Sequence, residues 1–293
     1  MPELPEIETI RRGLLPAMQG KRIARVEVRR PDLRIPLPRD LRRRLEGRRV
    51  ADIGRRAKYL LIELETQDVC VVHLGMSGRL FIELDHARPL DAHDHITITM
   101  DDGLRVTLND PRRFGLVALM TKAALPTHKL FAAVGPEPLA RAFDGSALEA
   151  ALKGRKTSLK AALSDQRLVA GLGNIYVCEA LFHAGLSPKR RAGTVKGQKA
   201  AALAASIKRV LSDAIASGGS SLRDYIQPSG ELGYFQHRWA VYDKEGQACP
   251  GCDCNARDAR QGGLSGGLVV KTRGVRRFVQ GGRSTFYCPR RQR

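Results

Sequence analysis

The chain changes from strand-like to helix-like hydrophobic spacing near its middle, and this change limits the folds it can adopt. Before about Phe131, short apolar runs bounded by turn residues predict β-strands. Residues 146–216 are instead rich in alanine, leucine and lysine at helical spacing. Gly135-Pro136-Glu137-Pro138 separates the two regions and predicts a linker. With 293 residues, the chain is long enough for two domains of about 100 to 200 residues each.

The first half begins with a predicted helix. Ile7, Ile10 and Leu14 recur at helical spacing, and Pro5 is acceptable in a first turn. Strands are predicted at residues 22–28, 59–64, 69–74, 95–100 and 104–108, the last two forming a hairpin across Asp101-Asp102-Gly103. We therefore expect one helix packed on a β-sandwich or barrel of short antiparallel strands, followed by a helical half.

The charge balance points to a polyanionic partner. Lysine and arginine number 50 against 30 aspartate and glutamate residues, a formal net charge of +20. Nucleic acid is preferred to a membrane, because no apolar run approaches the ~18 residues needed to span a bilayer. The first residues also lack the apolar core of a signal peptide, so a cytoplasmic protein is expected.

The amino terminus offers a candidate nucleophile. Removal of the initiator methionine before a small residue leaves Pro2 with a free secondary amine beside Glu3 and Glu6. An α-amino group has a pKa of about 7.7 to 8.0, so a useful fraction is neutral in the cell. A neutral amine can attack a sugar aldehyde carbon and form an iminium. The alternative is a frayed terminus without a function, since chain ends are usually disordered.

Cysteine spacing predicts a metal site near the carboxyl terminus. Four of the six cysteines, Cys249, Cys252, Cys254 and Cys288, lie in the last 45 residues. In a cytoplasmic protein, clustering at this density favours metal ligands over disulfides. Cys70 and Cys178 lie in apolar runs and are expected in the core.

Five separated motifs resemble those of bacterial formamidopyrimidine-DNA glycosylases. They occur in order, with family-like spacing, and are residues 2–9 (PELPEIET) with Lys58, 73–78 (HLGMSG), 109–115 (NDPRRFG), 173–176 (GNIY) and 282–288 (GRSTFYC). The resemblance implies an α+β fold: an N-terminal helix plus β-sandwich, a helical helix-two-turns-helix module and a C-terminal zinc-finger-like β-hairpin. It also implies a monomer that binds double-stranded DNA containing oxidised bases in the cleft between its halves, and so associates with the nucleoid.

The same resemblance divides the chain into four segments. These are a catalytic β-sandwich domain (1–133), a linker (134–150), a helix-two-turns-helix domain (151–236) and the hairpin (237–293). The segment from Ser217 to Tyr225 matches the loop that closes over an everted base in the family.

The resemblance implies a bifunctional DNA glycosylase and AP lyase of base excision repair, acting on 8-oxoguanine and formamidopyrimidines. Pro2 would attack C1′ of the damaged nucleoside and form a Schiff base, with Glu3 protonating the sugar oxygen. Lys58 and Arg283 match the proton donors of the β- and δ-eliminations. Glu6 is expected to be a structural partner; the alternative is that it helps to polarise the site.

The positions that match DNA contacts fall into two groups. Met76, Arg112 and Phe114 match the residues that fill the space left by the everted base, with the arginine facing the orphaned cytosine. From spacing alone, ordinary core positions are favoured for Met76 and Phe114. The positions that match or lie near contacts to phosphates or the DNA strand are His73, His93, Arg155, Lys160, Asn174 and Tyr242.

The zinc motif departs from the family pattern. Cys249-Pro250-Gly251-Cys252 is intact, but Arg291 stands where the fourth cysteine belongs, after a 35-residue spacer between Cys252 and Cys288. Arginine has no lone pair to offer a metal. Three alternatives follow: Cys254 is the fourth ligand of a structural zinc ion; three cysteines are completed by water or His237; or the hairpin forms without metal around Phe278, Phe286 and Tyr287.

Two rival functions remain open to the sequence. An endonuclease VIII-type glycosylase for oxidised pyrimidines is disfavoured by Leu4, where that branch usually has glycine, and by the Arg112-Arg113-Phe114 loop. A non-catalytic protein that only binds damaged DNA is disfavoured because binding alone requires neither Pro2 nor Glu3.

Overall fold

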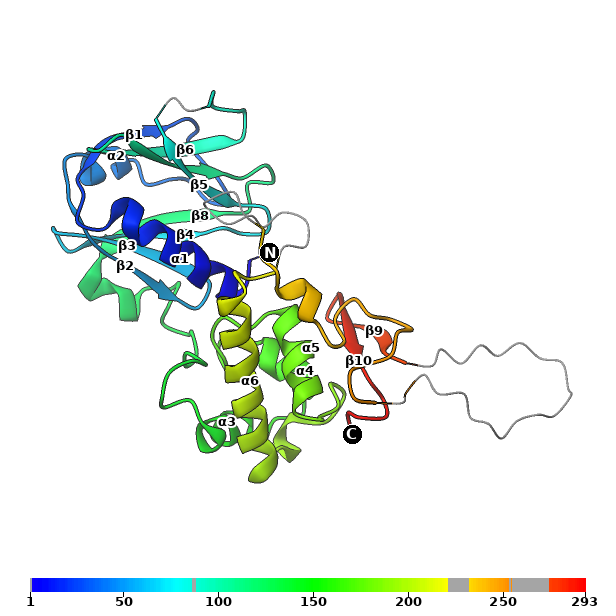
Figure 1. Cartoon of the computed structure of the whole chain (residues 1–293). Coiled ribbons are helices and arrows are strands. Elements are labelled where there is room, and N and C mark those ends of the chain that lie inside the picture. Colours follow the sequence, from blue (N-terminus) through cyan, green and yellow to red (C-terminus); the bar gives the residue numbers. More distant parts are fainter. Residues whose placement is uncertain (1, 86–87, 221–231, 253, 255–273) are drawn as a thin grey trace, which may run out of the picture. The chain divides into compact units, whose positions relative to one another are not determined.

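The computed structural model describes residues 2–85, 88–220, 232–252, 254 and 274–293. The chain forms two compact units, Met1–Glu137 with Ser212–His237, and Pro138–Leu211 with Arg238–Arg293 (Figure 1). Most of the predicted loop at 217–225 and of the insertion at 255–274 lies outside the described residues. The four-segment division expected from the sequence stays a prediction.

The first unit contains two four-stranded antiparallel sheets. One has the order β1 (Ile23–Val28), β6 (Asp94–Met100), β7 (Leu104–Asn109), β5 (Arg79–Leu84). The other has the order β2 (Val50–Arg56), β3 (Tyr59–Leu64), β4 (Asp68–His73), β8 (Leu116–Thr121). Two helices, α1 (Leu4–Met18) and α2 (Leu41–Leu45), and a 3-10 helix, η1 (Lys122–Thr127), complete the described elements before residue 138.

A single buried apolar cluster joins both sheets to α1. Ile7 of α1, Ile62 of β3 and Ile98 of β6 all belong to it. The spacing of Ile7, Ile10 and Leu14 puts these side chains on one helix face, and all three are at most 1% exposed. The predicted helix on a β-sandwich is confirmed, and so is the hairpin of β6 and β7.

The structure adds β2, β5 and β8 to the strands predicted from the sequence. β2 carries Arg55 and Arg56 near its end, and β5 carries Arg79 and Glu83, so charges interrupt the apolar alternation. Both strands are nevertheless paired along their length, β2 with β3 and β5 with β7.

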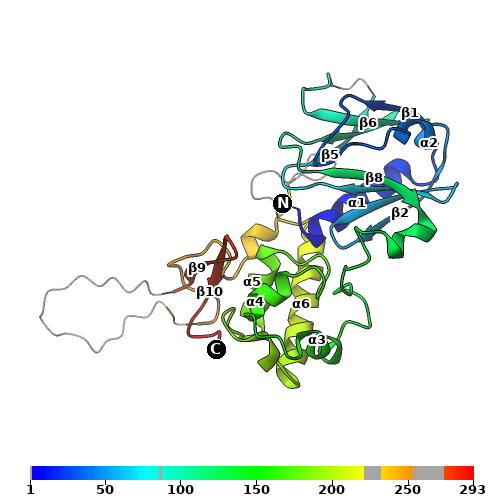
Figure 2. The same ribbon diagram turned by 180° about the vertical axis from the view of Figure 1, so that it is seen from behind.

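The second unit is mainly helical and ends in a hairpin. Its helices are α3 (Gly145–Leu152), α4 (Leu159–Ser164), α5 (Asn174–His183) and most of α6 (Gln198–Ala216); both views show α4 and α5 lying beside α6 (Figure 2). The 3-10 helices η2 (Ala192–Thr194) and η3 (Phe235–Arg238) follow α5 and α6, respectively. Strands β9 (Arg276–Gln280) and β10 (Arg283–Tyr287) pair in antiparallel fashion.

The hairpin turns on two glycines and packs against α5. Gly281 and Gly282 have φ angles of +57° and +70°, which suit a two-residue hairpin turn and are unfavourable for other residues. Phe286 of β10 shares a buried cluster with Cys178 and Phe182 of α5. The predicted helical module and C-terminal hairpin are therefore confirmed, and the turn places Arg283 at the first position of β10.

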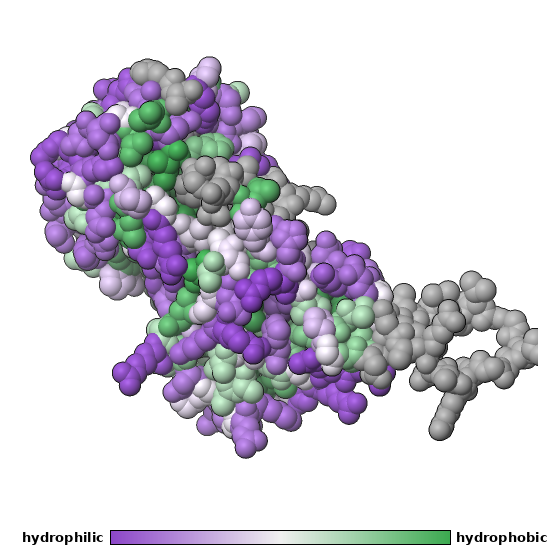
Figure 3. Space-filling model, in the orientation of Figure 1, coloured by the Kyte–Doolittle hydropathy of each residue, from purple (hydrophilic) through white to green (hydrophobic). Residues whose placement is uncertain are grey.

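Hydrophilic side chains cover much of the visible surface, with smaller apolar patches between them (Figure 3). None of the described helices is long and apolar enough to cross a membrane. Cys70 and Cys178 are 2% and 1% exposed, as the sequence predicts.

Candidate functional site

The amino end of α1 is buried and held by a shared carboxylate. Pro2 is buried, and Glu3 and Glu6 are 4% and 2% exposed. One oxygen of Glu6 accepts a hydrogen bond from the backbone nitrogen of Glu3 and the other from that of Ser220, both at 2.8 Å. A carboxylate in this position is also favoured by the dipole of α1. The terminus is thus fixed, and Glu6 has the structural role expected of it.

Lys58 lies in the tight turn between β2 and β3. Its side chain is 6% exposed, and it follows Ala57, whose φ of +52° is rare for a residue other than glycine. Burial lowers the pKa of His73, at the end of β4, to about 4, and the positive charges of Lys58 and Arg34 act in the same direction. The His73 imidazole is therefore neutral near pH 7, and its Nδ1 accepts a hydrogen bond from Gly75.

The two motif loops of the first unit are packed directly on each other. A Cβ at Gly75, where φ is +62°, would lie 2.3 Å from the carbonyl carbon of Phe114, so only glycine fits. Ser77 donates a hydrogen bond of 2.6 Å to Asp110 and accepts one of 3.2 Å from the backbone nitrogen of Arg112. The loop that carries Met76 is thereby joined to the loop that carries Arg112 and Phe114.

Asp110 is the fully buried centre of this junction. Its carboxylate also accepts a hydrogen bond of 2.7 Å from the backbone nitrogen of Gly115, and its own backbone nitrogen donates to the carbonyl of His93. No role was predicted for Asp110 from the sequence, although it lies inside a motif. The structure therefore brings together the loops of His73, Met76, His93, Arg112 and Phe114.

Apolar side chains project from these fixed loops. Met76 and Phe114 are 41% and 44% exposed, and the Arg112 guanidinium lies 4.6 Å from the centre of the Phe114 ring. Their exposure excludes the ordinary core position that spacing alone favours. Exposed apolar side chains on braced loops suit insertion between stacked bases.

In the second unit, Asn174 links α5 to the hairpin. Asn174 is the first residue of α5, and its Nδ2 donates to the carbonyl of Ser284 at 2.8 Å and to the hydroxyl of Tyr242 at 3.4 Å. The Tyr242 ring packs on Phe286, with centroids 5.1 Å apart. Asn174, Tyr242 and the strand that begins with Arg283 therefore lie together.

Glu179 was not identified from the sequence, but it organises this region. Its carboxylate, 1% exposed, accepts hydrogen bonds of 2.8 to 3.0 Å from the backbone nitrogens of Ala240, Val241 and Tyr242. Burial raises the pKa of Glu179, whereas these hydrogen bonds act in the opposite direction. The only sequence signal was a glutamate within the apolar run of α5.

The other two predicted DNA contacts lie elsewhere in the second unit. Arg155 is exposed just after α3, and its Nε donates to the carbonyl of Ala151. Lys160 lies in α4 and is only 3% exposed. Burial leaves little of the Lys160 side chain available to a phosphate in this conformation.

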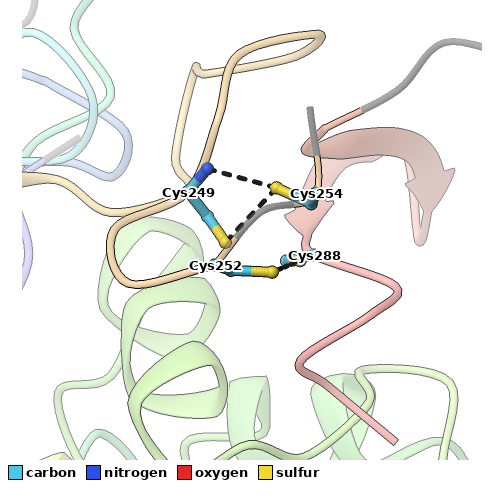
Figure 4. A group of neighbouring side chains, drawn as sticks. All are labelled: Cys249, Cys252, Cys254 and Cys288. Carbon is cyan, nitrogen blue, oxygen red and sulfur yellow. Dashed lines mark hydrogen bonds between the residues drawn. The ribbon is translucent and has the colours of Figure 1, made fainter. Parts of the chain in front are cut away.

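The four C-terminal cysteines converge on one point (Figure 4). The Sγ atoms of Cys249, Cys252, Cys254 and Cys288 all lie within 4.8 Å of one another. Two of the separations are 3.6 Å, between Cys249 and Cys254, and 3.9 Å, between Cys252 and Cys288. These distances are far longer than the ~2.05 Å of a disulfide.

The cluster fits a tetrahedral metal ion. With Zn–S bonds of about 2.3 Å, tetrahedral geometry requires sulfurs about 3.8 Å apart, and the two separations bracket this value. Of the three alternatives left by the sequence, the arrangement favours Cys254 as the fourth ligand. Among the described residues, no histidine, His237 included, belongs to the cluster. Arg291 has another role: its Nη1 donates to the carbonyl of Pro250 at 3.0 Å, and its guanidinium stacks on Phe182.

The chain matches two known family domains in the expected order. Residues 1–117 match the formamidopyrimidine-DNA glycosylase N-terminal domain, and residues 134–225 match the formamidopyrimidine-DNA glycosylase H2TH domain. Proteins named formamidopyrimidine-DNA glycosylase from Rhodospirillum rubrum and Rhodospirillum centenum are 55% and 52% identical, over 100% of both chains in each case.

Solved structures show the same similarity. The MutM (Fpg) protein of Thermus thermophilus has 37% identity and a TM-score of 0.81, covering 99% of this chain and 98% of that one. The wild-type Lactococcus lactis Fpg in complex with DNA containing N7-benzyl-Fapy-dG has 31% identity and a TM-score of 0.84, covering 100% of both chains. Matches of this length and identity leave no other assignment: the chain belongs to the formamidopyrimidine-DNA glycosylase family.

Proposed function

We propose that the chain is a bifunctional DNA glycosylase and AP lyase that excises oxidised purines from duplex DNA. The observation that carries the proposal is the fixed, buried segment at Pro2 and Glu3, which Glu6 joins to Ser220. A frayed terminus would show neither the burial nor the contacts. The similar Lactococcus lactis proteins, in complexes with DNA containing Fapy-dG (for a mutant form), N7-benzyl-Fapy-dG or an abasic site, support the substrate class.

The first step is nucleophilic attack by Pro2. Once Met1 is removed, the lone pair of the Pro2 nitrogen forms a bond to C1′ while the bond from C1′ to the base breaks. Glu3 protonates the sugar ring oxygen, the ring opens, and the nitrogen and C1′ become the iminium of a Schiff base. The Pro2 nitrogen gives up its own proton as the iminium forms, and the base, which leaves with the bonding electron pair, takes up a proton.

The lyase steps remove the sugar. Loss of a proton from C2′ expels the 3′ phosphate by β-elimination, and a further elimination expels the 5′ phosphate, leaving a one-nucleotide gap. We assign Lys58 to the first elimination and Arg283 to the second, as donors near the leaving phosphates. The buried turn of Lys58 and the first position of β10 give both side chains defined starting points.

We assign distortion of the DNA to the two packed motif loops, residues 73–78 and 109–115. Met76 and Phe114 would enter the space left by the everted nucleotide, and Arg112 would hydrogen-bond the orphaned base. Eversion costs a few kcal/mol, which contacts along the strand offset. We assign these contacts to His73, His93, Arg155, Lys160, Asn174 and Tyr242. Lys160, which is 3% exposed, must become accessible to make its contact.

We further propose that Cys249, Cys252, Cys254 and Cys288 hold one structural zinc ion. A bound zinc ion supplies a covalent anchor for the hairpin rather than chemistry at the sugar. Since Cys288 directly follows β10, the cluster fixes the strand that begins with Arg283. Its removal should therefore affect DNA affinity and the second elimination more than attack by Pro2.

Product analysis tests the proposed reaction and its rivals. End-labelled duplexes carrying 8-oxoguanine or an oxidised pyrimidine opposite its normal partner are incubated with protein lacking Met1. We expect cleavage of the 8-oxoguanine duplex to a gap with phosphate at both ends. Preferential cleavage of the pyrimidine lesion would replace the proposal with the endonuclease VIII-type activity, and tight binding without cleavage would replace it with a non-catalytic protein.

A further inference from the structure

Ala57 is held in an unfavourable backbone conformation directly before Lys58. Its φ of +52° lies in the left-handed region, and a two-residue hairpin turn with positive φ at this position usually carries glycine. Alanine adopts such a conformation only where surrounding contacts require it. Strain of this kind directly before Lys58 indicates that the backbone conformation here is needed to position the lysine.

Both peptide groups that flank the Ala57 Cα are held by side chains. The backbone nitrogen of Ala57 donates a hydrogen bond of 2.6 Å to Oε1 of Glu137, and the carbonyl of Ala57 accepts one of 2.9 Å from Nη1 of Arg55. Because that carbonyl belongs to the peptide bond between Ala57 and Lys58, the second contact fixes the orientation of the peptide group that precedes the Lys58 Cα.

Glu137 is the charged centre of these contacts. Its two oxygens lie 2.9 Å from Nη1 of Arg56 and 2.8 Å from Nη2 of Arg55, whose side chain is 10% exposed. Arg56 also donates to the carbonyls of Val134 and Gly135, so the segment that carries Glu137 is fixed to β2. Charge-assisted contacts of this number are stronger than neutral hydrogen bonds and are little screened when buried.

We propose that Glu137 is a positioning residue for Lys58. It holds the Ala57 turn in its left-handed conformation and so sets the direction in which the buried Lys58 side chain leaves the backbone. The inference rests on the proposed role of Lys58 in β-elimination. Glu137 itself need not touch DNA.

A double-mutant cycle tests this coupling. Single-turnover β-elimination on a duplex with a preformed abasic site is measured for the wild type, Glu137→Gln, Lys58→Ala and the double variant. We expect Glu137→Gln to slow elimination about tenfold, and less than about twofold in the Lys58→Ala background, because residues that act as one unit are not additive. Equal losses in the two backgrounds would overturn the inference.

Affinity and folding are measured alongside. The Kd for a duplex with a non-cleavable abasic analogue should stay within about twofold for Glu137→Gln, since the loss concerns the chemical step. If Glu137→Gln does not fold, Glu137→Asp replaces it: the shorter side chain keeps the charge but withdraws the acceptor from Ala57, and the same Lys58-dependent loss is expected.

Two further variants identify the turn as the intermediary. Glu63→Gln removes the ion pair of 2.6 Å between Glu63 of β3 and Lys122, without touching Ala57, and should leave the rate unchanged. Ala57→Gly makes positive φ favourable. Glu137→Gln should therefore reduce the elimination rate clearly less in the Ala57→Gly background than in the wild type. An undiminished loss there would contradict the mechanism.

Failure of this inference is distinguishable from failure of the proposed function. A wild-type protein without any Schiff base or elimination activity would refute the function itself. An active wild type with additive losses at Glu137 and Lys58 would refute only the positioning role.

Discussion

The backbone nitrogen of Ser220 donates a hydrogen bond of 2.8 Å to Glu6, 214 positions earlier in the chain. The other oxygen of Glu6 accepts from the backbone nitrogen of Glu3. A single buried carboxylate thus joins the predicted catalytic terminus to Ser220, which lies within the predicted lesion-recognition loop at residues 217–225.

Replacing the Glu6 carboxylate with an amide should lower the stability of the fold. In Glu6→Gln, the amide NH₂ must face one of the two backbone N–H groups, leaving a buried donor unsatisfied. We expect a loss of about 1 to 3 kcal/mol in the free energy of unfolding, measured with urea. Glu27→Gln is the control, because the ion pair of Glu27 with Arg25 is well exposed and should contribute less than about 1 kcal/mol. Equal stabilities of the two variants would contradict the structural role of Glu6.

Gly75→Ala should disturb the braced loops. The new Cβ would meet the Phe114 backbone at 2.3 Å, in addition to the strain of positive φ. Gly103→Ala is matched for strain, with φ of +84°, but its Cβ has nothing within 4 Å. Thermal unfolding should show a larger decrease for Gly75→Ala, by at least about 1 kcal/mol in free energy. DNA eversion, followed by fluorescence of a base analogue, should be impaired only in Gly75→Ala. Similar behaviour of both variants would argue against the close packing of the two loops.

Zinc content should depend on Cys254. The wild type is expected to contain one zinc ion per chain by elemental analysis, and Cys254→Ser to lose most of it, because a hydroxyl is a poor replacement for a thiolate ligand. Cys70→Ser changes a buried cysteine outside the cluster and should retain the metal. Retention of full zinc content in Cys254→Ser would exclude Cys254 as a ligand.

The neutral state of His73 predicts a pH dependence of stability. Burial holds the pKa of His73 at about 4 in the folded protein, against 6.5 for an unperturbed histidine. As the pH falls from about 6.5 to 4, the unfolded chain therefore binds a proton that the folded chain does not, and stability decreases by up to about 3 kcal/mol. His73→Gln keeps an acceptor for Gly75. We expect it to reduce the slope of the unfolding free energy against pH over this range and to leave that slope unchanged above pH 7. An identical slope in the variant would show that His73 titrates normally.

Local patterns predicted the elements whose burial follows a simple period. The helix face of Ile7, Ile10 and Leu14 and the β6–β7 hairpin are examples. β2 was not predicted, because Arg55 and Arg56 belong to an ion-pair network that only the folded chain completes.

The supporting residues of the candidate site were harder to predict. Ser77 and Asp110 are 33 positions apart, and Glu137 is 80 positions from Ala57. Local sequence spacing therefore cannot predict their contacts. Cys254 was one of three alternatives left open by the cysteine spacing, and the structure favours it because its sulfur lies 3.6 Å from that of Cys249.

The central claim is that Pro2 is the nucleophile, and borohydride trapping tests it most directly. Protein beginning at Pro2 is incubated with duplex DNA carrying 8-oxoguanine opposite cytosine, and borohydride is added to reduce any Schiff base. We expect a covalent protein–DNA adduct, and none from protein that retains Met1 or an amino-terminal tag, although that protein should still bind the duplex. Absence of an adduct from the correctly processed protein, or an equal yield from the blocked protein, would contradict the account.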